Sequence, residues 1–203
     1  FFQENGLTKE TALTLFIPNT YEFYWNTSAS KIASKMAKEH KKFWTNERLE
    51  KAKALNMTPA QVYTLASIVH KETVKADERP RVAGAYLNRI NQDMPLQADP
   101  TVIYAIKEKS GDFDQVIKRV GGSNLFVSSP YNTYINKGLP PGPIAMPDIS
   151  AIDAVLNAEK HNYIYFCADP SRPGYHSFET TYEAHLVNAK KYADWVNKLG
   201  IKL

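Results

Sequence analysis

The stretch MTPAQVYTLASIVHKETVKAD, residues 57–77, carries the strongest helix signal in the chain. Thr58 can cap the free amide groups of a helix, Pro59 suits the first helical position, and Gln61 completes a capping box. Apolar residues then recur with the period of a helix. The pattern predicts a helix over about residues 59–75. Its expected apolar face comprises Val62, Leu65, Ala66, Val69, Thr73 and Ala76.

Three polar residues near the end of this helix point in different directions. Successive side chains turn by about 100° around a helix axis, so Glu72 falls at the edge of the apolar face and His70 lies roughly 160° away from it. Lys71 points elsewhere again. A His and a Glu two positions apart on a helix cannot bind one metal ion, and the HExxH spacing is absent. We therefore expect His70 to be a partly exposed helix residue.

Glu72 has two possible roles that the residue pattern leaves open. A carboxylic acid set against apolar neighbours loses solvation of its charged form, so its pKa rises and it can deliver a proton to a leaving group. Alternatively, the carboxylate forms an ion pair at the helix edge, as many such residues do. The candidate partners for that pair are Arg79, Arg81 and Arg89.

The rest of the chain is expected to add helices and one small sheet. The aromatic and branched run NYIYFCAD, residues 162–169, is typical of a strand, and YHSFETT, residues 175–181, is its expected hairpin partner. Residues 111–147 are rich in Gly, Pro, Asn and Ser and predict a long loop. The fold class predicted is α+β, mostly helical, with a small antiparallel sheet in the C-terminal half. Further helices are expected from about Ser28, after Asp77, from Asp99, over residues 149–158 and from Tyr182.

Composition excludes several classes of protein. The chain has 203 residues, 43% of them hydrophobic, so it can bury a core and disorder is not expected. A net charge of +4 is too small and too dispersed to define a nucleic-acid surface. The single cysteine, Cys167, excludes an intramolecular disulfide and is expected to be a small buried core residue. The sequence contains no zinc-ligand spacing, GxSxG motif, Walker loop or dinucleotide fingerprint.

The ends of the chain also carry an expectation. It begins FFQENG, without an initiator Met or a signal-peptide pattern, and no apolar run approaches the ~18 residues of a membrane span. We expect residues 1–203 to be a single catalytic domain cut from a longer protein, with any membrane anchor upstream.

Six segments, in order and spanning nearly the whole chain, resemble one enzyme family. It is the endolytic murein transglycosylase (YceG-like) family of membrane-anchored lytic transglycosylases, which cut the glycan strands of peptidoglycan. Any one segment is a weak signal, whereas six in register are specific. The segments are LASIVHKET, ERPRVAGAYLNRI, MPLQADPTVIYA, SPYNTYINKGLPPGPIAMP, YIYFCAD and HSFETTYEAH.

The resemblance implies a reaction and a catalytic residue. Glu72 aligns with the second acidic position of the family's EKE-like motif and is implied to be the catalytic acid, whereas His70 stands at the first acidic position. The implied reaction is non-hydrolytic cleavage of the MurNAc-β-1,4-GlcNAc bond, which leaves a 1,6-anhydro-MurNAc end and needs no metal or organic cofactor. We expect Glu72 to act as general acid and then, as carboxylate, as the base that accepts the proton of the C6 hydroxyl. The implied location is the cell envelope, with an inner-membrane anchor and the catalytic domain on the periplasmic side. Cell-wall synthesis proteins are possible partners, and an N-terminal glycan-binding subdomain would lie outside this chain.

Other residues in the matching segments are candidates for substrate binding. Amide and phenol groups suit sugar hydroxyls and N-acetyl carbonyls, and an aromatic ring can face a pyranose ring. Each candidate also has a structural alternative: the loop residues can hold their own backbone, the aspartate can cap a helix, and the histidine can be a hydrogen-bonded strand residue. The candidates are Gln97, Asp99, Tyr131, Asn132, Tyr134 and His176.

Three other functions remain possible at this point. A glycan hydrolase would use Glu72 and Asp99 as two carboxylates, if they face each other across a cleft. A cell-wall binding module would have lost the catalytic function of its acid. His70, at the first acidic position of the motif, is the one sequence feature that favours this function. An interaction domain would use the Pro-rich loop to bind proteins and would not bind glycan.

Overall fold

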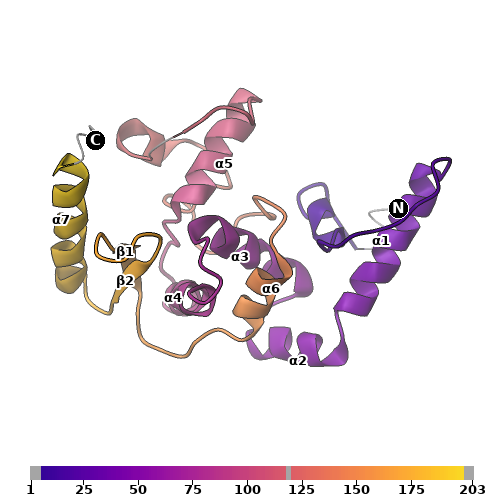
Figure 1. Ribbon diagram of the computed structural model, residues 1–203, viewed down its shortest axis with the longest axis horizontal. Helices are drawn as coiled ribbons and strands as arrows, with labels where there is room; N and C mark the ends of the chain where they lie inside the picture. The colour runs from indigo at the N-terminus through magenta and orange to yellow at the C-terminus, as the bar shows by residue number, and fades with distance from the viewer. Residues whose placement is uncertain (1–5, 118–119, 199–203) are drawn as a thin grey trace.

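The computed structural model describes residues 6–117 and 120–198, and helices make up most of this part of the chain (Figure 1). The sheet has two strands, and both lie in the C-terminal half. The predicted α+β class, mostly helical with a small antiparallel sheet, is confirmed. The elements are the 3₁₀ helices η2 (Ala12–Leu15) and η3 (Gly122–Phe126), the helices α1 (Ala29–Phe43), α2 (Asn46–Ala54), α3 (Pro59–Glu72), α4 (Arg79–Asn91), α5 (Asp99–Ser110), α6 (Ile149–Leu156) and α7 (Tyr182–Lys198), and the strands β1 (Tyr165–Ala168) and β2 (His176–Glu179).

Helix α3 lies at the centre of the molecule and packs against α4, α5 and α6. Its start is as predicted: the Thr58 side chain accepts a hydrogen bond from Gln61 N, and Gln61 returns one to Thr58 N. The one-sided apolar face was wrong, because every residue from Val62 to Val69 is buried. Small and apolar side chains occur all round this helix, which is the pattern of a helix inside a core.

The end of α3 also differs from the prediction. The helix stops at Glu72 instead of Lys75, because Thr73 adopts an extended conformation with φ −135° and ψ 135°. Ala76, predicted for the apolar face, is exposed. The chain therefore leaves the helix axis directly after Glu72, which places this side chain at the helix terminus.

Helix α4 carries the second part of the core. It begins at Arg79 with a proline in its first turn, as expected. At Gly84 a Cβ atom would lie 2.4 Å from the backbone oxygen of Glu159, so only glycine allows this approach. The segment after α6 thus crosses directly over α4 before it enters the sheet.

The hairpin and α7 form the C-terminal part of the fold. Strands β1 and β2 pair antiparallel, with Phe166 opposite Phe178, and α7 packs against both strands. The Asn88 side chain of α4 donates hydrogen bonds to the carbonyls of His161 and Tyr163, at 2.7 and 3.0 Å. These bonds fasten the incoming strand to the helical core.

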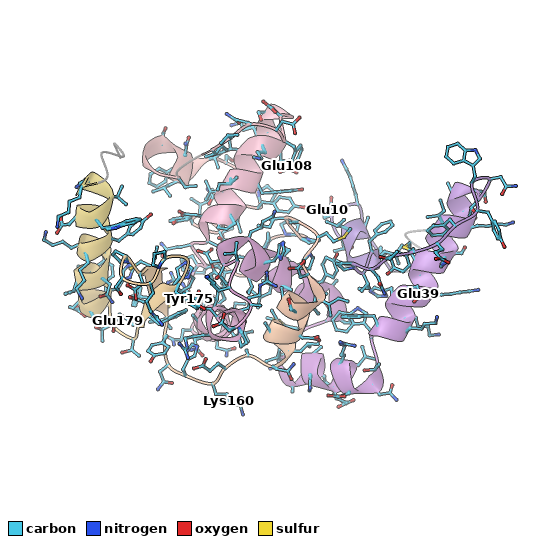
Figure 2. The ribbon with its side chains drawn as sticks, in the orientation of Figure 1. Glu10, Glu39, Glu108, Lys160, Tyr175 and Glu179 are labelled. Atoms are coloured by element: carbon cyan, nitrogen blue, oxygen red, sulfur yellow. The ribbon has the colours of Figure 1, made fainter. Side chains whose placement is uncertain are left out.

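The other predicted segments can be compared directly. Helix α1 follows Ser28, α6 lies within the predicted 149–158, and residues 111–147 hold only η3 in their described part. Helix α2 was not predicted. No helix within the described residues is long and apolar enough to cross a membrane. Charged side chains such as Glu108 and Lys160 lie at the outside of the fold (Figure 2).

Candidate active site

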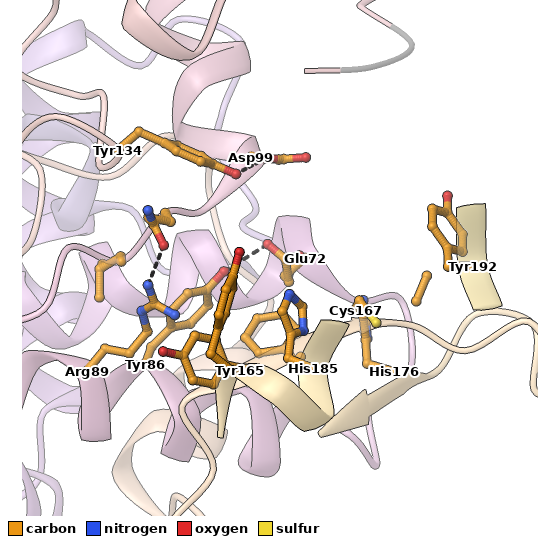
Figure 3. Close-up of a pocket in the computed structure, with 15 residues that line it drawn as sticks. Glu72, Tyr86, Arg89, Asp99, Tyr134, Tyr165, Cys167, His176, His185 and Tyr192 are labelled. Atoms are coloured by element: carbon orange, nitrogen blue, oxygen red, sulfur yellow. Dashed lines mark hydrogen bonds between the residues drawn. The ribbon is translucent and has the colours of Figure 1, made fainter. Parts of the chain in front are cut away.

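A cavity of about 380 Å³ lies between the helical core and the hairpin with α7 (Figure 3). The end of α3, the middle of α4 and the start of α5 form one side of it, and β1, β2 and α7 form the other. Five of the seven residues predicted for the site line it. They are Glu72, Gln97, Asp99, Tyr134 and His176.

The side chain of Glu72 lines this cavity and is half-buried. The Tyr86 hydroxyl donates a hydrogen bond of 2.9 Å to Glu72 Oε2. Burial raises the pKa of Glu72 above its ordinary value; nearby His176 and the bond from Tyr86 oppose the rise, and the charges of Asp99 and Glu78 add to it. The acid is therefore held in a setting that favours its protonated form.

The ion-pair alternative for Glu72 is contradicted. No Lys, Arg or His lies within ion-pair distance of Glu72 among the residues that the structure describes. The three candidate arginines contact other groups. Arg79 pairs with Asp148 at 3.2 Å, Arg81 pairs with Glu159 at 3.0 Å, and Arg89 donates to the carbonyls of Pro95 and Ile164.

Asp99 lies in the same cavity and does not cap its helix. The N-cap of α5 is Ala98, and Asp99 is the first helical residue, so its carboxylate is free to accept a 2.6 Å hydrogen bond from the Tyr134 hydroxyl. The expected capping role was therefore wrong. Burial and this bond raise the pKa of Tyr134, so the phenol keeps its proton as a donor. In Figure 3 the Asp99–Tyr134 pair lies above Glu72.

Gln97 is held in the cavity wall by both its backbone and its side chain. Its φ of 53° is left-handed, and its N–H donates to the Thr133 carbonyl at 3.0 Å. Its side-chain oxygen accepts a 2.6 Å hydrogen bond from Arg89, which also donates to Ile164 O at 2.7 Å. One arginine thus joins the loop before α5 to the start of β1, and burial lowers its pKa.

The structure does not bring Tyr131 and Asn132 to the cavity. Asn132 is fully buried, and its amide donates to the carbonyls of Leu125 and Val127 while its oxygen accepts from Tyr134 N. Tyr131 is buried against Tyr104, with ring centroids 4.6 Å apart. Asn132 thus holds the loop backbone, which matches the structural alternative stated above, whereas Tyr131 packs the loop against α5.

The two histidines of interest occupy separate places. His176, on β2, lines the cavity, and its Nδ1 lies 2.8 Å from Glu78 Oε2. His70 is partly exposed, as expected, and its Nδ1 lies 3.3 Å from Asp148 Oδ2. The separation of His70 and Glu72 around the helix is confirmed, because His70 does not line the cavity.

Several cavity residues escaped prediction from the sequence. Tyr86 was not among the candidates, and Cys167, expected in the core, is half-buried and lines the cavity. Three residues of α7 also line it, and at 100° per residue they share one helix face, a signal that the sequence did contain. They are Tyr182, His185 and Tyr192.

Comparison with known proteins identifies the family. The model of the YceG-like family matches residues 3–191. An endolytic murein transglycosylase of Bacillus subtilis is 34% identical over 182 residues, which cover 89% of this chain and 48% of that protein. One of Streptococcus pneumoniae is 39% identical over 117 residues, 58% of this chain and 21% of that protein. The chain thus spans about half, or less, of the curated relatives that it matches.

A solved structure agrees with these matches. A YceG-like protein of Listeria monocytogenes superposes with a TM-score of 0.72 at 34% identity, covering 86% of this chain and 54% of that one. The family resemblance noted in the sequence is confirmed. Since the family model covers nearly all of the chain and the fold is shared, this chain belongs to the YceG-like family.

Proposed function

We propose that this chain is the catalytic part of a lytic transglycosylase that cleaves the glycan strands of peptidoglycan, with Glu72 as its general acid. The observation that carries the proposal is a half-buried carboxyl group that lines a cavity, with a raised pKa and without an ion-pair partner in the described part of the chain. The names of the curated relatives support the same reaction class.

One carboxyl group suffices for this chemistry. Ordinary glycosidases use two, one to protonate the leaving oxygen and one to act as nucleophile or to activate water. Here the C6 hydroxyl of MurNAc attacks its own anomeric carbon, and its intramolecular position supplies the effective concentration. Glu72 protonates the glycosidic oxygen as the bond breaks, a general base takes the proton of the C6 hydroxyl, and the product carries a 1,6-anhydro ring.

The neighbouring groups suit sugar binding. Gln97, Asp99, Tyr134 and His176 present hydrogen-bonding atoms toward one cavity. Tyr165 adds an aromatic ring on the hairpin side, where the Arg89 guanidinium lies 5.7 Å from its centroid. We propose that these residues hold the two sugars on either side of the cleaved bond, whereas Tyr131 and Asn132 act only by supporting the loop.

A second candidate function is favoured by the position of Asp99. Its carboxylate lines the same cavity as Glu72, and its charge raises the pKa of Glu72. A hydrolase with Glu72 as acid and Asp99 as base would use this arrangement, and its product would contain one added water.

Digestion of purified glycan strands tests both candidates. The wild-type chain should release products with anhydro ends, and Glu72→Gln should lower kcat at least about 100-fold because the general acid is lost. Products that are heavier by one water would favour the hydrolase. Retained activity in Glu72→Gln would exclude Glu72 as the acid in either reaction.

Stability measurements provide the control for folding. The ordinary pKa of Glu72 is 4.5, and the folded value is higher, so the folded state binds this proton more tightly than the unfolded chain. The stability that the proton provides is present below pH 4.5 and is lost as the pH rises through the raised pKa. Gln cannot ionise and still accepts from Tyr86. Glu72→Gln should therefore melt at or above the wild-type temperature at neutral pH, with a smaller difference in acid.

The setting of the reaction is also a proposal. Because peptidoglycan lies outside the inner membrane, we propose that the parent protein acts in the cell envelope, anchored in the inner membrane with the catalytic domain on the periplasmic side. Residues 1–203 would form its single catalytic domain, with cell-wall synthesis proteins as possible partners.

A further inference from the structure

We propose that His176, which lines the cavity, and Glu78 behind it form a second acid–base pair, in which His176 instead of Glu72 takes the proton of the attacking C6 hydroxyl and Glu78 positions His176. The proposal rests on the proposed function and adds a division of labour to it. Glu72 would deliver one proton, and His176 would accept the other.

The geometry of the pair is closely defined. Glu78 Oε2 lies 2.8 Å from His176 Nδ1, and Glu78 Oε1 accepts a 2.7 Å hydrogen bond from the His176 backbone N–H. One carboxylate therefore holds both the ring and the backbone of a residue 98 positions away. The exposed fractions of the two side chains are only 3% for Glu78 and 12% for His176.

The carboxylate determines which ring nitrogen carries the proton. Burial alone would raise the pKa of Glu78, but the hydrogen bonds and charge of His176, together with a hydrogen bond from Thr73, outweigh it, and the pKa is lowered. An ionised Glu78 can only accept, so the neutral imidazole carries its hydrogen on Nδ1. Its Nε2 then presents a lone pair, and the described residues offer this atom no hydrogen-bond partner.

The ring is also fixed from the side. The Phe166 ring lies 5.4 Å from the His176 ring at an interplanar angle of 85°, and the same phenyl ring meets Tyr86 edge-on at 5.5 Å. His176 lies near enough to Glu72 to affect its pKa, and both side chains line the cavity. The acid, on α3, and the proposed base, on β2, would thus face the same sugar when one is bound in the cavity.

Each proton in this step has a donor and an acceptor. The glycosidic C1–O bond breaks as its oxygen takes the proton of Glu72, and the bond from O6 to C1 forms as the C6 hydroxyl gives its proton to His176 Nε2. Glu72 is left as carboxylate and His176 as imidazolium, which the Glu78 charge stabilises. Solvent then returns a proton to Glu72 and removes one from His176, so no co-reactant is needed.

A second histidine–carboxylate pair provides a matched control. His70 Nδ1 lies 3.3 Å from Asp148, but these side chains are 22% and 56% exposed and lie outside the cavity. Replacing His70 thus removes a comparable pair without touching the proposed machinery.

Kinetics of glycan digestion provide the first test. His176→Gln and Glu78→Gln should each lower kcat about 10²-fold with KM little changed, because general base catalysis is lost while sugar contacts remain. His70→Gln should leave both constants at the wild-type value. Free imidazole should restore part of kcat to His176→Ala. Unchanged kcat in Glu78→Gln, or an effect on KM alone, would overturn the proposal.

Nitrogen NMR of the histidine rings provides a test that does not depend on activity. The His176 signal of the wild-type chain should report the neutral Nδ1–H tautomer, and Glu78→Gln should shift it toward Nε2–H. An Nε2–H tautomer in the wild type would overturn the inference even if the variants fail to fold. A wild-type chain that forms no anhydro ends would instead contradict the proposed function.

Discussion

At the scale of single residues, the position of Glu72 at the last turn of α3 determines its properties. Glu72 lies on the side of α3 away from His70 and faces the cavity. Thr73, which follows directly, is extended and ends the helix. Burial raises the pKa of Glu72, while Tyr86 and His176 limit the rise. The acid strength of this residue is thus set by a few neighbours that can be changed one at a time.

The hydroxyl of Tyr86 offers the simplest change. It donates to the Glu72 carboxyl and lowers the pKa of Glu72, so Tyr86→Phe should raise that pKa further. Since the reaction needs protonated Glu72, the alkaline limb of the kcat/KM profile should move to higher pH. This variant leaves unchanged the other groups that influence the pKa of Glu72, namely His176, Asp99 and Glu78.

A pH profile of glycan cleavage measures this effect. Tyr63→Phe is the control, because the Tyr63 hydroxyl donates to Phe16 O at 2.7 Å in the core and does not line the cavity. It should leave the alkaline limb in place. An alkaline limb that moves to lower pH in Tyr86→Phe would contradict the assignment of Glu72 as the acid.

At the scale of elements, a local signal was sufficient for where α3 starts, whereas α2 was missed. The capping box at Thr58 and Gln61 depends on residues three positions apart, and it fixed the start of α3. The end of α3 depends on a distant contact, since the chain must turn after Glu72 for Glu78 to reach His176 on β2. Local pattern carries no information about a partner 98 residues away, so the end was placed too late.

The same distinction explains which site residues were predictable. Glu72, Gln97 and Asp99 belong to motifs that could be recognised from the sequence. Tyr86 and Tyr165 also lie in matching segments, but they reach the cavity through the packing of α4 against the hairpin, which the sequence alone does not specify. Conversely, Asn132 was assigned to the substrate although its side-chain amide donates to the loop carbonyls of Leu125 and Val127.

The capping box leads to a prediction about stability. Thr58→Ala should lower the free energy of unfolding by about 1 kcal/mol, because the N–H of Gln61 loses its partner. Thr58→Ser keeps a hydroxyl and should retain most of the stability. Chemical denaturation measures both variants, and kcat should stay unchanged because the cap lies at the far end of α3 from Glu72. A loss of activity without a loss of stability would contradict this division between scaffold and site.

At the scale of the whole molecule, the cavity depends on how two parts of the chain are held together. The helical core around α3 supplies Glu72 and Asp99, and the hairpin with α7 supplies His176 and the aromatic wall. Helix α7 packs mainly on the two strands, so hairpin and helix can open as one unit. Bonds between the two parts are therefore expected to control both local opening and access to the cavity.

The Asn88 side chain makes the clearest of these bonds. Its amide donates to the carbonyls of His161 and Tyr163, in the segment that leads into the hairpin. Asn88→Ala leaves both acceptors without this donor and should increase opening of the hairpin and α7 roughly tenfold, since such a loss costs about 1–2 kcal/mol. Native-state hydrogen exchange should then be faster in β1, β2 and α7 and unchanged in α3. Asn157→Ala is the matched control, because Asn157 donates only to Asp153 O within its own helix turn. Equal acceleration in α3 and the hairpin would mean that the molecule opens as a single unit, and the two-part description of the cavity would then be wrong.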